Sequence, residues 1–165
     1  EAQRPFLASS HANPQNASSE MNPTDLIHFL LEAADQIRVF HWGTRSEPEH
    51  EALGGLYDAI SDATDKIAES LMGSQGGKRL TLKGSLELVD YTPGAPANYV
   101  AGIADGLKSL KGLPTDILNM RDDLLGTVHK TIYLLTLSVG EAAEQETPMT
   151  EAAEGETGTE PPVQE

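Results

Sequence analysis

The sequence predicts an all-α protein whose middle section, residues 21–139, folds as an antiparallel bundle of four helices. Three observations lead to this fold class. Four segments repeat apolar residues at the three-to-four-residue spacing of a helix. Capping residues or prolines begin these segments, and glycines or prolines end them. The flanking residues 1–20 and 140–165 lack such a repeat and are poor in large apolar residues, so we expect disordered extensions there.

The first two helices are predicted from clear start signals. Asn22, Pro23 and Asp25 supply a capping side chain, a proline and an acid at the start of the first helix, which Gly43 ends. Ser46 opens an S-x-x-E capping box at the start of the second helix. The link between the two helices is so short that they must be antiparallel neighbours. The apolar stripe of the second helix contains Leu53, Leu56, Tyr57, Ile60, Thr64, Ile67 and Leu71.

The sequence pattern of residues 73–94 differs from that of the predicted helices. Their first glycines break the second helix, and leucines then alternate loosely with polar residues. This pattern fits either a short hairpin around Lys83 and Gly84 or an extended crossover that carries a helical turn.

The third and fourth helices follow this long connection. Pro96 opens the third helix, Thr115 begins the fourth, and Gly140 is expected to stop it. Two helix pairs joined by one long crossover match the ferritin-like bundle. We expect the shared core to contain Leu30, Phe40, Leu56, Ile60, Ile103, Leu107, Leu125 and Ile132.

Composition and charge exclude several classes of function. The chain carries a net charge of −15 over 165 residues, and its eleven Lys and Arg are scattered, so we expect no nucleic-acid partner. The first twenty residues hold no apolar run long enough for a signal peptide or a membrane span, and no membrane partner is expected. The absence of cysteine excludes disulfides and thiolate chemistry. The eight glutamates that follow Val139 predict a solvated acidic tail.

The residues that carry chemistry lie on the first two helices. His41 ends the first helix, and His50 stands in the first turn of the second. Asp65 and Glu69 are four residues apart, so they share one face of the second helix, away from its apolar stripe. Imidazoles and carboxylates together suit iron, manganese or zinc. Fifteen helical residues separate His50 from Asp65 by about 22 Å, so only a chain packed antiparallel across a two-fold axis could join the two halves.

These residues carry a resemblance to a known family. The pattern His41-Trp42, His50-Glu51-Ala52-Leu53 and then Asp65-Lys66-Ile67-Ala68-Glu69-Ser70 resembles the Dps mini-ferritins, the DNA-protecting proteins of starved bacteria. The resemblance covers about thirty continuous residues. The short loop after Gly43 is most similar to the Dps-like proteins encoded by bacteriophages.

The resemblance implies an intersubunit ferroxidase site in a homo-oligomer that contacts itself through a two-fold helix-two interface. His41 and His50 of one chain and Asp65 and Glu69 of its mate would bind iron, with no catalytic residue separate from these ligands. Trp42 would line the site. The implied location is the cytoplasm of a bacterium or of a phage-infected host, with the virion as the alternative.

Two departures from the family pattern keep a second function open. Gly54 stands four residues after His50, where the family has a carboxylate, and Ser70 stands where the family often has arginine. The N-terminal arm carries only Arg4, so the family's DNA binding is not expected here. The sequence therefore supports two hypotheses. One is a mini-ferritin that oxidises and stores iron, and the other is a non-enzymatic, phage-encoded structural or interaction bundle with a degraded metal site.

Overall fold

The computed structural model describes residues 22–144, and side chains over residues 22–137. The predicted N-terminal extension, and the acidic tail after Glu144, lie outside the described residues. Four helices make up the fold: α1 (Pro23–Gly43), α2 (Glu47–Ser74), α3 (Ala95–Ser109) and α4 (Thr115–Glu144). The described residues contain no strand, so the predicted all-α class is confirmed. None of these helices is long and apolar enough to span a membrane over the part of the chain that was described.

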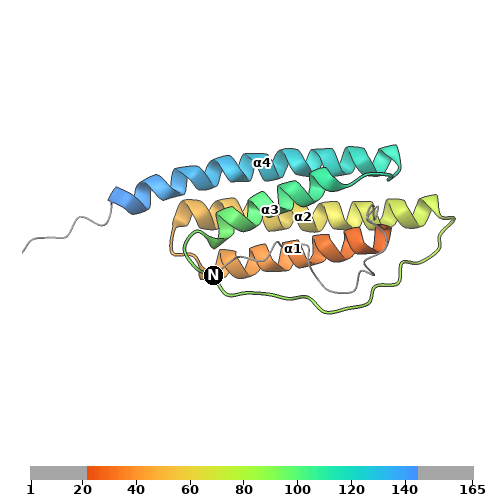
Figure 1. Ribbon diagram of the computed structural model, residues 1–165, viewed down its shortest axis with the longest axis horizontal. Coiled ribbons are helices and arrows are strands. Elements are labelled where there is room, and N and C mark those ends of the chain that lie inside the picture. The colour runs from red at the N-terminus through yellow and green to blue at the C-terminus, as the bar shows by residue number, and fades with distance from the viewer. Residues whose placement is uncertain (1–21, 145–165) are drawn as a thin grey trace, which may run out of the picture.

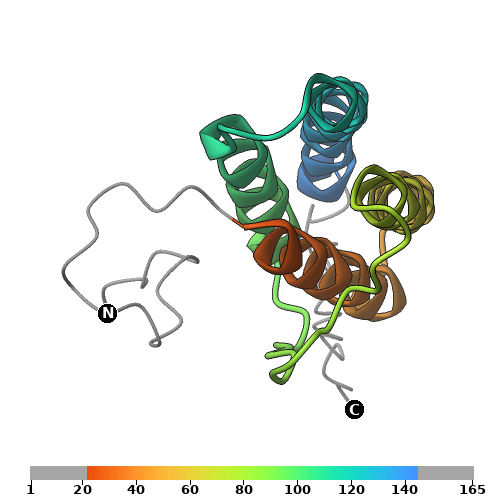
Figure 2. The ribbon, with the colours of Figure 1, turned by 90° about the vertical axis from the view of Figure 1, so that its right-hand side faces the viewer.

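The four helices form an antiparallel bundle with ferritin-like connectivity (Figure 1). The helices α1 and α2 form one antiparallel pair, and α3 and α4 form the other. The crossover runs back along the length of the bundle, so α3 starts at the same end as α2 and the two run parallel. Viewed along the bundle, α2 packs between α1 and α4, and α3 lies on α4 and α1 (Figure 2).

The helix starts follow the predicted capping signals. The Asn22 side chain accepts hydrogen bonds from the backbone N–H groups of Thr24 (2.9 Å) and Asp25 (3.0 Å). The Ser46 hydroxyl accepts one from the Glu49 N–H at 3.4 Å. The predicted capping box is only half formed, however, because the Ser46 N–H donates to the Thr44 hydroxyl (3.1 Å) instead of to Glu49. The Glu49 carboxylate instead accepts hydrogen bonds from the Thr44 and Tyr91 hydroxyls.

The end of α4 differs from the prediction. The helix continues past Gly140 to Glu144, whereas the sequence was expected to stop it at Gly140. A single glycine inside a helix costs only about 1 kcal/mol relative to alanine. The residues that follow are two alanines between two glutamates, which are strong helix formers, so the helix continues through the glycine.

The crossover, residues 75–94, is extended between a turn at residues 75–77 and a turn at residues 93–94, and the alternative hairpin around Lys83 and Gly84 is wrong. It contains neither a strand pair nor a helical turn. Instead it lies along α1 (Figure 1). Gln36 of α1 is 1 % exposed and holds it there, because the side-chain amide donates to the Val89 carbonyl (2.8 Å) and accepts from the Val89 N–H (2.7 Å). A helix side chain therefore replaces the partner strand that a hairpin would supply.

The core confirms most of the predicted residues. Leu30, Phe40, Leu56, Ile60, Ile103 and Leu107 are fully buried, whereas Leu125 and Ile132 are only partly buried. The reason lies in the rotation of α4 about its axis. Its inward stripe consists of Ile117, Leu124, Val128, Thr131 and Leu135, so Leu125 and Ile132 lie at the edge of the core.

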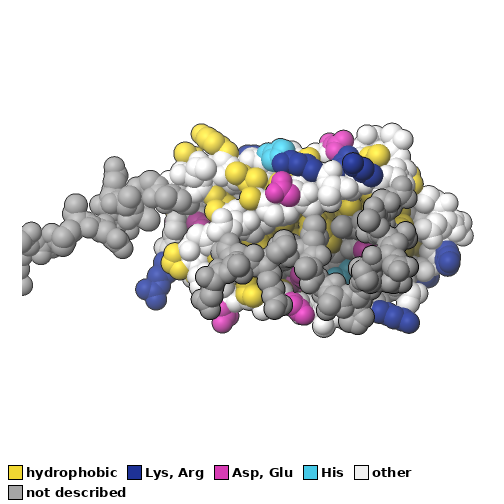
Figure 3. All heavy atoms as spheres, viewed as in Figure 1, with side chains coloured by type: hydrophobic (Ala, Val, Ile, Leu, Met, Phe, Trp, Pro, Cys, Tyr) yellow, Lys and Arg dark blue, Asp and Glu magenta, His cyan; other side chains and the backbone are white. Residues whose placement is uncertain are grey.

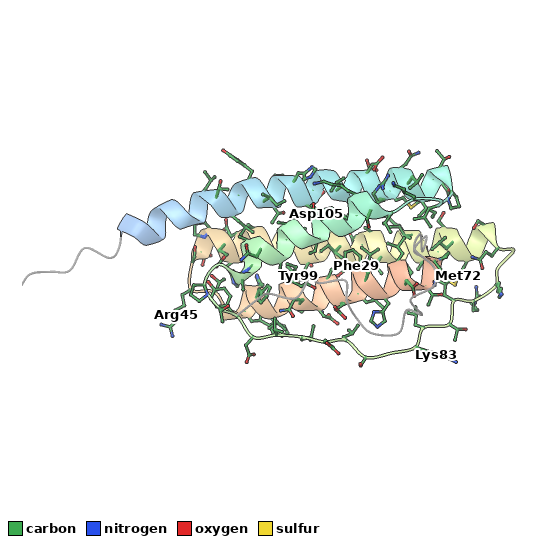
Figure 4. The ribbon with its side chains drawn as sticks, in the orientation of Figure 1. Phe29, Arg45, Met72, Lys83, Tyr99 and Asp105 are labelled. Atoms are coloured by element: carbon green, nitrogen blue, oxygen red, sulfur yellow. The ribbon has the colours of Figure 1, made fainter. Side chains whose placement is uncertain are left out.

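Two contacts fix α3 in the bundle. Tyr99 packs edge-on against Phe40 of α1, with ring centroids 5.6 Å apart, and burial raises the pKa of its hydroxyl. Figure 4 shows Tyr99 and Phe29 in the layer between α1 and α3. At the other end, the Arg121 guanidinium of α4 donates to the carbonyls of Leu107 (3.1 Å) and Leu110 (3.2 Å). The Leu107 carbonyl also accepts from the Leu110 N–H (3.2 Å) where α3 ends, so Arg121 adds to this helix-end hydrogen bond and ties α3 to α4.

Candidate functional site

The short α1–α2 turn brings His41 and His50 into direct contact. Their rings stack with centroids 3.7 Å apart and an interplanar angle of 23°. Each ring is held by the backbone of the other residue. The His41 Nδ1 lies 2.8 Å from the His50 carbonyl oxygen, and the His50 Nδ1 lies 2.8 Å from the His41 carbonyl oxygen. We call this arrangement the histidine pair.

The hydrogen bonds of the histidine pair fix its protonation pattern. A carbonyl oxygen can only accept, so each Nδ1 must carry a proton. In the neutral imidazole, each Nε2 then keeps its lone pair. Histidines that bind metals commonly donate their other ring N–H to a carbonyl or carboxylate in this way. The histidine pair thus has the tautomer and the orientation support that a metal ligand needs.

The side of the histidine pair that faces α2 is closed by Tyr57. The Tyr57 ring meets His41 edge-on, with centroids 5.3 Å apart and an angle of 70°. The Arg38 guanidinium lies over the Tyr57 ring at 4.9 Å and pairs with Asp35 at 2.5 Å. Asp35 and Arg38 also line an open groove on α1 and α2. Tyr57 therefore contacts the histidine pair on one side and a residue of this groove on the other.

Gly54 is explained by the position of His41. A Cβ at residue 54 would lie 3.1 Å from His41 Cε1 and 3.3 Å from its Nδ1. The His41 ring therefore lies across one turn of α2, from His50 to Gly54, and fills the place of a side chain at Gly54. An acidic side chain four residues after His50, as in the Dps pattern, would have its Cβ in tight contact with His41, so the ring would have to shift by a few tenths of an ångström.

Replacing Gly54 by alanine tests this close approach. Because the hydrogen bond and the stack against His50 prevent His41 from moving away, we expect the free energy of unfolding in urea to fall by about 1–2 kcal/mol. The neighbouring Gly55 is the matched control, since a Cβ there meets nothing within 4 Å. Gly55→Ala should raise the stability by up to about 1 kcal/mol through helix propensity. Equal effects of the two substitutions would show that His41 does not pack on Gly54.

A buried carboxylate beside the histidine pair was not predicted. Glu49 is 9 % exposed and accepts hydrogen bonds from the Thr44 hydroxyl and from the Tyr91 hydroxyl, the latter at 2.9 Å. Burial raises the pKa of Tyr91, and the neighbouring Glu49 carboxylate raises it further, while the hydrogen bond with Thr44 lowers it. The sequence indicated only a capping role for Glu49, because Tyr91 is 42 residues away.

The other two predicted ligands lie far from the histidine pair in the same chain. Asp65 and Glu69 are exposed on α2, and Asp65 is about 22 Å along the helix from His50. Trp42 is 69 % exposed and open to solvent. Within the described residues, no group of three or more His, Asp or Glu comes together as a potential metal site. The structure therefore brings together His41 and His50 and leaves both carboxylates apart from them.

Asp65 faces an open groove between α1, α2 and the crossover. The groove has a volume of about 430 Å³. Its lining is mainly apolar, with Arg38, Asp35 and Asp65 as its charged residues. The groove is lined by Ile27, Leu31, Ala34, Asp35, Arg38, Ser61, Thr64, Asp65, Ala68 and Leu82.

Further along α2, the Ser70 hydroxyl donates to Asp116 of α4 at 2.9 Å. The residue at the position of the family arginine thus joins two helices of one chain.

The fold and the histidine pair together define a four-helix bundle protein with a preorganised pair of imidazoles at its α1–α2 turn. Residues 41–135 match DUF5856, a family of unknown function. This match covers more than half of the chain, so the protein belongs to the DUF5856 family. The matched segment starts at His41 and contains both histidines and both predicted carboxylates. Comparison with the curated proteins and with the solved structures gave no match.

Proposed function

We propose that this protein is a Dps-like iron-binding protein that oxidises Fe(II) at a site shared between two chains. The observation that carries the proposal is the histidine pair, in which two reciprocal hydrogen bonds of 2.8 Å leave both Nε2 lone pairs for a metal. Iron is the substrate of this site.

The carboxylates of the proposed site come from a second chain. Asp65 and Glu69 are exposed on the outward face of α2, so an antiparallel α2 across a two-fold axis could bring them to the histidine pair. Two imidazoles and two carboxylates form a mixed nitrogen and oxygen ligand set that suits Fe(II). In a two-fold dimer the same contact is made twice, so each dimer would hold two equivalent sites.

The reaction follows from this ligand set. Carboxylates favour the ferric state because it carries the higher charge. Hydrogen peroxide accepts one electron from each of two Fe(II) ions and, with two protons, becomes two molecules of water. Dioxygen is the alternative oxidant. The ferric product would be sequestered inside a hollow oligomer, as the resemblance to Dps proteins implies.

Anaerobic titration with Fe(II), followed by peroxide and monitored by absorbance, tests the proposal. We expect the unmodified protein to bind and rapidly oxidise iron, and His50→Ala and Asp65→Ala to lose this oxidation while keeping their helicity. His129→Ala and Asp105→Ala are matched controls, because both residues are exposed and lie on α4 and α3, outside the helices that carry the proposed ligands. An unmodified protein that neither binds nor oxidises Fe(II) would rule out the iron function.

Mixing two inactive variants tests whether the site is shared. When His50→Ala and Asp65→Ala chains are unfolded and refolded together, a mixed dimer contains one intact site and one site that lacks both residues. Half of the dimers are mixed at random assembly, so the mixture should recover about a quarter of the unmodified activity. A mixture as inactive as its components would show that the ligands do not come from two chains.

The second candidate function is a non-enzymatic structural or interaction bundle. It is favoured by Gly54, because the family's carboxylate is missing there and a Cβ at this position would press on the ring of His41. Loss of one supporting carboxylate weakens metal binding by about one to two orders of magnitude. In this case the protein would form the same bundle and oligomer, and would bind Fe(II) no more tightly than His50→Ala.

A further inference from the structure

The crossover carries an exposed extended segment, residues 85–90, beside α1. Every residue from 81 to 90 is exposed. The two hydrogen bonds between the Gln36 amide and Val89 show its local conformation. One side-chain amide can reach both the N–H and the C=O of a single residue only when that residue is extended, because both groups then point to the same side. Val89 therefore has the geometry of a β-strand residue.

The direction of the other backbone groups follows from strand alternation. The Glu87 N–H, two residues before Val89, also faces α1 and lies 3.5 Å from the Glu32 carboxylate. The N–H and C=O groups of Leu86, Leu88 and Asp90 must then point away from α1. Within the described part of the chain, no hydrogen bond reaches the backbone of these three residues. One edge of the segment is bound to α1, and its other edge is open.

We propose that this open edge pairs with the same segment of a second copy of the chain, as a two-stranded antiparallel ladder with Leu88 on the two-fold axis. An open strand edge is a template for strand addition. A two-fold axis through Leu88 places Leu88 opposite its copy, Leu86 opposite Asp90, and Glu87 opposite Val89. This register uses every outward N–H and C=O of residues 86–90 on both chains.

Charge and backbone conformation exclude the neighbouring registers. An axis at Glu87 or Asp90 would place a carboxylate directly opposite its own copy, which is destabilising. An axis at Leu86 would require Gly84 to pair, but its φ of 122° takes it out of the extended conformation. An axis at Val89 leaves the outward groups of Leu86 to pair with residue 92, beyond the extended segment. The Leu88 register avoids all three problems.

Exposed apolar side chains support a second copy as the occupant. Leu86 is 37 % exposed, Leu88 46 % and Val89 60 %. Leu82 and Leu31, which flank the groove beside this segment, are 43 % and 37 % exposed. Pairing across the two-fold axis would place Leu88 against its own copy and Leu86 diagonally beside the partner's Leu88, and each buried square ångström of apolar area contributes about 25 cal/mol. Figure 3 shows one face of the molecule, on which hydrophobic, basic and acidic side chains of the described residues lie side by side.

A single engineered thiol tests the register, because the protein contains no cysteine. Hydrogen-bonded antiparallel pairs have Cα atoms about 5.5 Å apart, within the range of about 4.4–6.8 Å that a disulfide spans. We expect metal-free Leu88→Cys to form a disulfide-linked dimer under mild oxidation, seen on a non-reducing gel. Leu82→Cys is the matched control, since two residues six positions from the axis lie about 40 Å apart.

Three results would overturn the proposed pairing. They are a Leu88→Cys protein that stays monomeric, a Leu82→Cys protein that links equally well, and unmodified protein that sediments as a monomer. Leu88→Pro adds an independent measurement. Proline removes the outward N–H of residue 88 and leaves the Gln36 contact with Val89 in place, so the dimer should dissociate at higher protein concentration with unchanged helicity.

The same experiment separates this inference from the iron function. The cross-link needs neither metal nor histidine, so Leu88→Cys should link equally well when His50 is also replaced by alanine. A linked dimer that does not bind Fe(II) would refute the iron proposal and support the strand pairing. An unlinked protein that oxidises iron would do the reverse.

Discussion

Replacing Glu49 by alanine is expected to lower the free energy of unfolding by about 2–3 kcal/mol. The carboxylate is 9 % exposed and accepts from the hydroxyls of Thr44 and Tyr91. Hydrogen bonds to a charged group are stronger than those between neutral groups, and their loss leaves two donors without an acceptor in a half-buried place. The change also removes the hydrogen bond by which Tyr91 holds the crossover to the α1–α2 turn. Urea unfolding followed by circular dichroism measures the effect.

Two further variants identify which interactions of Glu49 supply this free energy of unfolding. Glu47→Ala is the matched control, because Glu47 lies in the same first turn of α2 but is exposed. It should change stability by no more than about 0.5 kcal/mol. Tyr91→Phe removes one of the two donors and should lower stability by about 1 kcal/mol. Similar losses for Glu47→Ala and Glu49→Ala would mean that the helix terminus, and not the buried hydrogen bonds, supplies the stability.

Replacing Gly106 by alanine is expected to lower the free energy of unfolding by about 1–3 kcal/mol, although alanine is the better helix former. Gly106 is buried where α3 approaches α1. A Cβ at this position would lie 2.8 Å from Cζ of Phe29 and 3.2 Å from its Cε2. Phe29 is itself only 7 % exposed, so the two helices would have to separate to accept the methyl group.

Gly102, one turn earlier on α3, provides the control for this substitution. A Cβ at Gly102 meets nothing within 4 Å, so Gly102→Ala should stabilise the protein by up to about 1 kcal/mol. The two substitutions are chemically identical and occur in the same helix, and the opposite signs would come from packing alone. If Gly106→Ala stabilises as much as Gly102→Ala, then α3 does not approach α1 as closely as described.

The local features of the fold were predictable from the sequence. Asn22, Pro23 and Ser46 begin their helices as expected, because capping depends on a side chain and the few backbone groups beside it. The apolar stripe of α2 is also buried as predicted, apart from the half-buried Tyr57. A helical repeat of apolar residues has one stable solution, which is to face a shared core.

The candidate site was predictable only in part. The spacing of His41, His50, Asp65 and Glu69 predicts a ligand set, and the length of α2 indicates that one chain could not assemble it. The stacking of the two histidines and their reciprocal hydrogen bonds were not predictable. They depend on the path of the α1–α2 turn, whose carbonyl groups the rings bind.

The sequence by itself determined the four helices and their antiparallel pairing, because each depends on neighbours within a turn or a short link. Only the tertiary structure decided the role of residues whose partners lie far along the chain. Glu49 accepts a hydrogen bond from Tyr91 instead of completing its capping box, and Gln36 binds the backbone of Val89. Gly54 lacks the side chain that would press on His41. A buried polar group must take whichever partner the fold brings to it, and the local sequence does not encode that partner.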